Sequence, residues 1–482
     1  MASNFSNGHP LSRRSFLADT GMGLTGLALG SLLQRDGVAR AAEVDRGPHF
    51  PGKAKTVIWI FLCGGVSHLE SFDPKPVLEK YSGKKVSQTP HADALSPEKN
   101  PFALKLERGA EQLPLLGMQA GFKRYGKCDM EVSDFFPNIG GCADDIAVVR
   151  SLWTSSVFHS AQLQFHTGRQ PREVGLPTIG SWVSYGLGTL NQNLPDYVVL
   201  GTPTGSCCGS EGGFGAGYLG PRYGGVRLNV ESKNPLPFVA PADPNLLPEE
   251  RTAQLGALGK LNELAGVEYP DDPALRARIQ SYELAARMQT SVPETLQLAK
   301  ESDETKKLYG IDQNETKSFG TLCLAARRLA ERGVRFVQVF HGTGDFGPWD
   351  SHEKLKEGHG RAARAVDKPI AGLVQDLKQR GLLKETLVVC GTEFGRTPTT
   401  GGAGREHSPF GFSSWLAGGG VQGGIVHGKT DEIGYHAVED RHYITDIHAT
   451  VLHQLGVDSR RLEIPGRKRL DIDHGKPIKA IL

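Results

Sequence analysis

Several side chains that bind metal ions well lie in the last third of this 482-residue sequence. Asp350 and His352 occur in the stretch WDSH, Glu393 in GTEFGR and His407 in GREHSP. Carboxylates and imidazoles are the ligands that zinc prefers, and carboxylates also suit calcium and magnesium. These residue types predict a divalent metal site, with zinc as the first candidate and calcium or magnesium as alternatives.

Each of these residues also has an ordinary structural explanation. Asp350 could cap a turn beside a surface His352, and Glu393 could form an ion pair with the nearby Arg396. The metal site is favoured because the candidate ligands follow predicted strands. In an open α/β sheet, binding sites form at the carboxyl ends of the strands.

Short hydrophobic runs predict those strands. A run without polar alternation is typical of a strand buried on both faces of a parallel sheet. The runs with this pattern are residues 55–62, 146–149, 197–200, 334–340 and 386–390. They predict an α/β fold with a mostly parallel central sheet.

One βαβ unit should bring three candidate ligands together. The run at 334–340 leads into a loop with Asp350 and His352, and the run at 386–390 leads directly to Glu393. A helix is predicted between them, because apolar residues recur at spacings of three and four at Ala362, Val366, Ile370, Leu373 and Leu377. A right-handed crossover places both strand ends at one edge of the sheet.

Composition and length limit the other possibilities. The net charge is +2 without a dense basic run, which argues against nucleic-acid binding. No run approaches the ~20 apolar residues that cross a bilayer, so we expect no stable membrane span. We expect a single domain over residues 50–482. A polar stretch rich in Leu, Ala, Glu and Lys, at about 229–316, predicts a helical insertion or flank.

The first 42 residues predict an export signal. The sequence SRRSFL at 12–17 precedes a weakly apolar, glycine-rich stretch at 21–33 and the small residues ARAA at 39–42. This order resembles a bacterial twin-arginine signal. It predicts a partner, the twin-arginine export machinery, and a periplasmic or secreted location.

The motifs taken together resemble the DUF1501 family. They are GGVSHLESFD, WDSH, LVVCGTEFGRTP, GREHSP, LAGGGVQGG and DIHATVL, and they extend from about residue 55 to 458. That family is similar in layout to the alkaline phosphatase and sulfatase superfamily. The resemblance implies an alkaline-phosphatase-like α/β sandwich and hydrolysis of phosphate or sulfate esters.

The resemblance also implies roles for single residues. Asp350 and His352 resemble the middle ligand group of the superfamily, and His407 resembles its final histidine. Glu393 stands at the first position of an Asp-His pair, with Phe394 in place of the histidine.

The aspartate that the superfamily has after its first strand is missing, because CGG occupies that turn at 63–65. His68, Glu70 and Asp73 follow soon after. Glu70 is the candidate replacement ligand, and His68 is a candidate acid or base. Asp73 precedes a proline and has the simpler explanation of a turn residue.

The sulfatase nucleophile motif shows the largest departure. Its pattern is [C/S]-x-P-S-R-x-x-x-x-T-G-R, whereas residues 158–169 read FHSAQLQFHTGR. Phe158 falls on the nucleophile position, so a formylglycine mechanism is not expected. Ser156, His159 or Ser160 could act at the helix start, where the dipole favours an anion. A metal-activated water is the alternative.

Two arginines are candidate substrate ligands. The guanidinium groups of Arg169 and Arg396 offer a planar fork that suits phosphate or sulfate oxygens, although each could be structural instead. We therefore predict an exported, metal-dependent hydrolase whose substrate is an anionic ester, with a sulfated or phosphorylated glycan as a candidate. The alternative is a non-catalytic periplasmic binding or surface-associated protein that retains the fold. Phe158, Phe394 and the missing aspartate favour that alternative.

Overall fold

The computed structural model describes residues 47–95, 110–170, 172–173, 175–203, 205, 209–232, 235–236, 291–464, 466–467 and 469–482, with isolated positions between 247 and 288. Contacts divide the chain into two units, residues 1–45 with 463–468 and residues 46–462 with 469–482. In the first unit, Ile464 and Arg467 form an antiparallel bridge. The predicted export signal and much of the predicted insertion at 229–316 lie outside the described residues.

A nine-stranded sheet forms the centre of the second unit. Its order is β12-β4-β11-β8-β1-β7-β5-β6, and β15 pairs with the end of β4. Their bounds are Ile425–His427 (β12), Ile146–Trp153 (β4), Phe412–Ala417 (β11), Thr386–Gly391 (β8), Thr56–Leu62 (β1), Phe336–His341 (β7), Tyr197–Gly201 (β5), Val226–Leu228 (β6) and His442–Tyr443 (β15). All pairings are parallel except those of β11 with β4 and β8. The predicted mostly parallel sheet is confirmed.

The five predicted strands are present, with shifted ends. The largest shift is at β4, which continues past the apolar run to Trp153. The extension follows from pairing, because Leu152 lies opposite Phe412 of β11 and opposite His442 of β15. Partners on both sides therefore hold polar residues of β4 in extended conformation.

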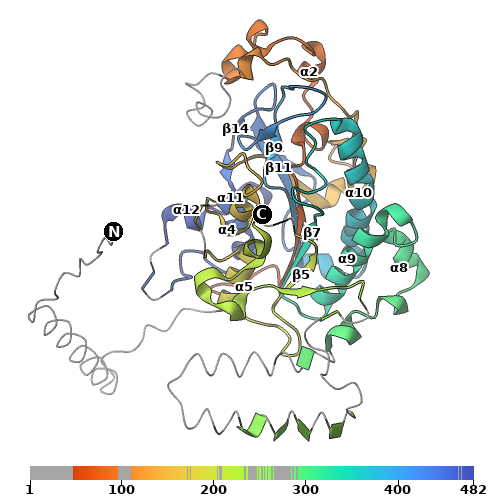
Figure 1. Ribbon diagram of the computed structural model, residues 1–482, viewed down its shortest axis with the longest axis vertical. Coiled ribbons are helices and arrows are strands. Elements are labelled where there is room, and N and C mark those ends of the chain that lie inside the picture. The colour runs from red at the N-terminus through yellow and green to blue at the C-terminus, as the bar shows by residue number, and fades with distance from the viewer. Residues whose placement is uncertain are drawn as a thin grey trace, which may run out of the picture. The chain divides into compact units, whose positions relative to one another are not determined.

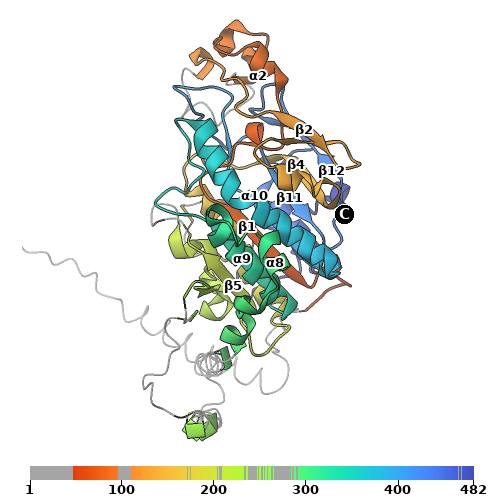
Figure 2. The same cartoon turned by 90° about the vertical axis from the view of Figure 1, so that its right-hand side faces the viewer.

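Helices cover both faces of this sheet (Figures 1 and 2). One face carries α9 (Asn314–Glu331) and α10 (Leu355–Gln379), and the other carries α4 (Ala161–Thr167), α5 (Ile179–Leu187) and α11 (Ile444–Gln454). Alternation along β1 explains the two layers. Ile58 and Ile60 join the core cluster that contains Ile370 of α10. Trp59 and Phe61 point to the opposite face, where each ring centroid lies 5.2 Å from that of Phe165 in α4.

Shorter elements surround the sheet. The helices are α2 (Pro76–Lys80), α3 (Pro137–Gly140), α8 (Asp303–Leu308) and α12 (Asp471–His474). Three two-stranded ribbons pair β2 (Phe122–Tyr125) with β3 (Met130–Ser133), β9 (Gly395–Arg396) with β10 (His407–Ser408), and β13 (Lys429–Thr430) with β14 (Ala437–Glu439). Among the helices that the structure describes, none is both long and apolar enough to cross a bilayer.

A tight glycine turn after β1 brings three chain segments into contact. Gly64 has φ +117°, and a Cβ there would lie 2.6 Å from the backbone nitrogen of Asp350. At Gly65, with φ +82°, a Cβ would lie 2.3 Å from the ring of Phe394. Only glycine fits at both positions. The CGG turn therefore allows the loop after β7 and the segment after β8 to approach the end of β1.

A buried ion pair links the segment after β1 to the β9–β10 ribbon. Glu70, in the 3₁₀ helix His68–Glu70, accepts hydrogen bonds from Arg405 over 2.7 Å, and both side chains are fully buried. The same guanidinium donates to the carbonyls of Thr397 and Pro398.

Removing one charge of this pair tests its structural importance. Glu70→Gln leaves the Arg405 guanidinium buried without a counter-charge, so we expect the free energy of unfolding to fall by about 3–5 kcal/mol. The matched control is Lys55→Gln in the exposed Lys55–Glu385 pair, at 2.8 Å, where the change should stay below about 1 kcal/mol. Urea titrations followed by circular dichroism measure both, and equal losses would contradict the prediction.

Candidate metal centre

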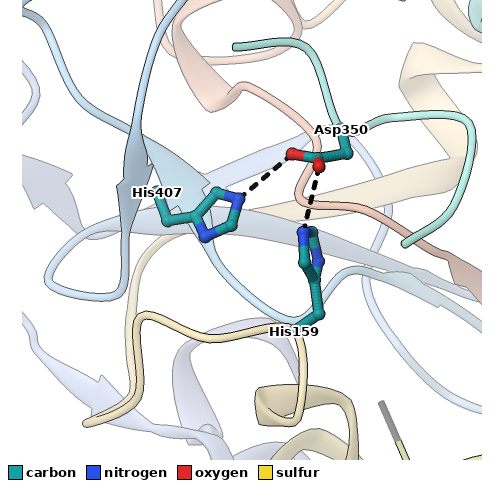
Figure 3. Close-up of side chains that lie close together, drawn as sticks. All are labelled: His159, Asp350 and His407. Carbon is teal, nitrogen blue, oxygen red and sulfur yellow. Dashed lines mark hydrogen bonds and ion pairs between the residues drawn. The ribbon is translucent and has the colours of Figure 1, made fainter. Parts of the chain in front are cut away.

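Three residues from different parts of the chain converge beyond the carboxyl ends of the central strands. Asp350 lies in the loop after β7, His407 begins β10, and His159 lies between β4 and α4. One ligand atom from each lies within 4.8 Å of the other two. Figure 3 shows both imidazoles turned towards the carboxylate. The structure thus brings together the two predicted ligands Asp350 and His407 and adds His159.

The Asp350 carboxylate is the centre of this group. Its Oδ2 lies 3.2 Å from His159 Nε2, and its Oδ1 lies 3.1 Å from His407 Nε2. Burial would favour the protonated acid, but hydrogen bonds from His159 and His352 and the charge of Arg396 hold the pKa of Asp350 well below its usual range. The group is therefore an anion at neutral pH.

A hydrogen bond at Nδ1 fixes the tautomer of His407. Its Nδ1–H donates to the carbonyl oxygen of Val157 over 2.6 Å, so a neutral ring presents a lone pair at Nε2. Burial lowers the pKa of His407, which favours the neutral ring. Two acceptors, Nε2 and the Asp350 carboxylate, then face each other. A cation bound by both atoms would satisfy both.

His159 is backed by a second carboxylate. Its Nδ1 lies 3.2 Å from Glu393 Oε1, and this oxygen also accepts from the backbone N–H of Gly64 over 2.8 Å. Burial opposes the charged ring, but hydrogen bonds to Asp350 and Glu393 raise the pKa of His159 to about 9. With Glu393 holding Nδ1, the ring can offer Nε2 to a metal ion, as in carboxylate–histidine–zinc arrangements.

The donor set fits zinc. Two imidazole nitrogens and one carboxylate oxygen match zinc ligand chemistry, whereas calcium and magnesium prefer oxygen ligands throughout. Glu393 was predicted as a metal ligand, but its oxygens contact His159, Gly64 and Thr392. We therefore propose it as the partner that orients His159.

His352 lies at the open side of the site. Its Nε2 is 3.1 Å from Asp350 Oδ1, and its Nδ1 is 2.8 Å from Glu406. The side chain is 40% exposed. The hydrogen bond to Asp350 raises the pKa of His352, against the effect of burial. His352 therefore contacts the same carboxylate as His159 and His407, but it is not one of the three residues whose ligand atoms lie within 4.8 Å of one another.

Arg396 supports the site from the inside. Its guanidinium is fully buried and donates to Asp350 Oδ1 over 3.0 Å, to Gly65 O over 2.8 Å and to Arg405 O over 3.1 Å. It also contacts the carbonyls of Gly64 and Trp349. These bonds leave no exposed surface for a substrate oxygen, so Arg396 is placed to hold Asp350 rather than to bind the predicted ester.

The other predicted site residues form the following contacts outside this group. Glu70 is occupied by Arg405, and His68 Nε2 bonds to the carbonyl of Gly434 over 2.7 Å. Arg169 forms ion pairs with Glu173 and Asp473. Ser156 Oγ accepts from the backbone N–H of Phe158 over 3.4 Å.

Metal content of protein purified without a histidine tag tests the centre. We expect Asp350→Asn and His407→Gln each to lose one zinc equivalent per chain, because each removes a ligand atom. Glu393→Gln should weaken zinc binding by about 10–100-fold, since it disturbs the partner of a ligating histidine. His91→Gln, whose ring packs against Tyr81, is the control. Undiminished zinc in Asp350→Asn would rule out the centre.

Several solved structures match this chain at low sequence identity and with low TM-scores. The lipoteichoic acid synthase LtaP from Listeria monocytogenes matches with 10% identity and a TM-score of 0.36, over 91% of this chain and 79% of its own. The sulfatase PsFucS1 from Pseudoalteromonas sp. matches with 13% identity and a TM-score of 0.34, over 92% and 72%. Lipooligosaccharide phosphoethanolamine transferase A from Neisseria meningitidis matches with 10% identity and a TM-score of 0.35, over 89% and 97%.

No curated protein matches the sequence. A family model described as "Protein of unknown function (DUF1501)" matches residues 54–482, which include all the residues of the metal centre. The chain therefore belongs to the DUF1501 family, as its motifs predicted.

Proposed function

We propose that this protein is a metal-dependent hydrolase of phosphate or sulfate esters. The observation that carries the proposal is the convergence of His159, Asp350 and His407, whose ligand atoms lie within 4.8 Å of one another. Each has a second partner, namely Glu393, Arg396 and the carbonyl of Val157. Such backing is typical of metal sites whose ligands must be held in place.

The number of protein ligands supports catalysis over a purely structural role. Structural zinc sites are usually closed by four protein ligands, whereas catalytic sites use three and keep one position open. A cation there would supply Lewis acidity, polarising an ester oxygen or making water more acidic. The chain would contribute one nitrogen each from His159 and His407 and an oxygen from Asp350, whose carboxylate is held by the buried guanidinium of Arg396.

Water is the attacking group in this proposal. Phe158, at the position that the sulfatase pattern gives to the nucleophile, is 64% exposed and has no nucleophilic atom. The adjacent His159 is directed to Asp350 and Glu393. We therefore assign His159 to metal binding and leave the partly exposed His352 as the imidazole nearest to an incoming ester.

Export and substrate class are further parts of the proposal. The SRRSFL sequence at 12–17 supports twin-arginine export to the periplasm or beyond. An anionic ester suits a site with a divalent cation, and a sulfated or phosphorylated glycan is the candidate source of such esters. The competing function is a non-catalytic metal-binding protein, which Phe158 at the nucleophile position favours.

Turnover of aryl phosphates and aryl sulfates separates these two functions. We expect zinc-loaded wild type to hydrolyse one of the two classes and His407→Gln to reduce kcat/KM by about 10³-fold, equivalent to several kcal/mol of Lewis-acid stabilisation. His91→Gln should keep wild-type kinetics. If zinc-loaded wild type turns over neither class, even at high concentrations of enzyme and substrate, the result supports the non-catalytic function instead.

A further inference from the structure

A second group of imidazoles lies at the β12 side of the sheet and has no part in the centre described above. His427 ends β12 and His442 begins β15, and both strands pair in parallel with β4. The register places His427 opposite Val149 and His442 opposite Leu152. One strand thus fixes the backbone of both histidines.

The two rings face each other through the same nitrogen. The Nε2 atoms of His427 and His442 are 2.9 Å apart, and the ring centroids are 5.1 Å apart. The side chains are 13% and 17% exposed, so the pair is largely shielded but open to solvent and small ions. In the metal-free pair this is a hydrogen-bond distance, and it also lets both nitrogens reach one metal ion.

A carboxylate holds His442 from behind. Its Nδ1 lies 2.8 Å from Asp446 Oδ2, and Asp446 Oδ1 accepts from the backbone N–H of Lys476 over 2.8 Å. Because the carboxylate only accepts, Nδ1 carries a proton and a neutral His442 ring has its lone pair at Nε2. His427 has a looser partner, Asp440, whose Oδ2 lies 4.0 Å from Nδ1.

We propose that His427 and His442 bind a divalent transition-metal ion through their Nε2 atoms, with Asp446 as the positioning carboxylate. Metal–imidazole bonds are about 2.0–2.1 Å long, so nitrogens 2.9 Å apart subtend about 90° at the ion. A right angle suits square-planar or tetragonal Cu(II) and Ni(II) better than tetrahedral zinc. Water can fill the remaining positions.

The test uses the full chain without a histidine tag, stripped of metal and titrated with Cu(II). We expect His442→Gln and His427→Gln each to bind one copper equivalent fewer than wild type and to lose an electron paramagnetic resonance signal with imidazole nitrogen couplings. Asp446→Asn should weaken that equivalent by about 10–100-fold. His407→Gln should keep it, which separates this site from the proposed catalytic centre.

His453→Gln is the matched control, because this histidine belongs to α11, as Asp446 does, but its ring contacts that of Phe50 at a centroid distance of 5.0 Å. It should bind copper as wild type does. Thermal unfolding of the metal-free variants checks that each is folded. The proposal is overturned if folded His442→Gln or folded His427→Gln keeps the wild-type copper stoichiometry and spectrum, as expected for two rings that only share a proton.

Discussion

The candidate centre depends on one mostly buried carboxylate and the positive or metal-binding groups around it. Asp350 faces three imidazoles within 3.2 Å and a fully buried guanidinium at 3.0 Å. An ionised carboxylate in such a place requires compensation, because burying an unpaired charge is strongly unfavourable. Arg396 supplies a compensating positive charge, and a divalent cation held by the imidazoles would add to it.

The fold places these groups by ending its strands at one edge. The parallel strands β1, β7 and β8 end at the CGG turn, before the Asp350 loop and at Glu393. The glycines let these segments approach, and Arg396 then bonds to carbonyls in two of them. The Glu70–Arg405 pair ties the β9–β10 ribbon, which carries His407, to the segment after β1. The strands themselves follow from local sequence, whereas contacts between residues far apart in the chain bring the site residues together.

The sequence predicted the parts of this account that depend on local pattern. Apolar runs located the strands, and ligand-type residues after those runs located Asp350 and His407. The role of Glu393 could not be read in the same way, because its carboxylate direction depends on Gly64 and His159, more than 230 residues earlier in the chain. Two other predictions depended on long-range contacts in the same way. Glu70 was predicted as a metal ligand, but its carboxylate pairs with Arg405. Arg396 was predicted to bind substrate, but its guanidinium is fully buried.

The most direct test of the account is anomalous X-ray diffraction at the zinc edge from crystals of zinc-loaded protein. We predict a peak about 2.0–2.2 Å from Nε2 of His159, from Nε2 of His407 and from a carboxylate oxygen of Asp350. We also predict that Glu393 contacts Nδ1 of His159 and does not contact the metal ion. The account is contradicted if zinc-loaded crystals show no anomalous peak between these three side chains.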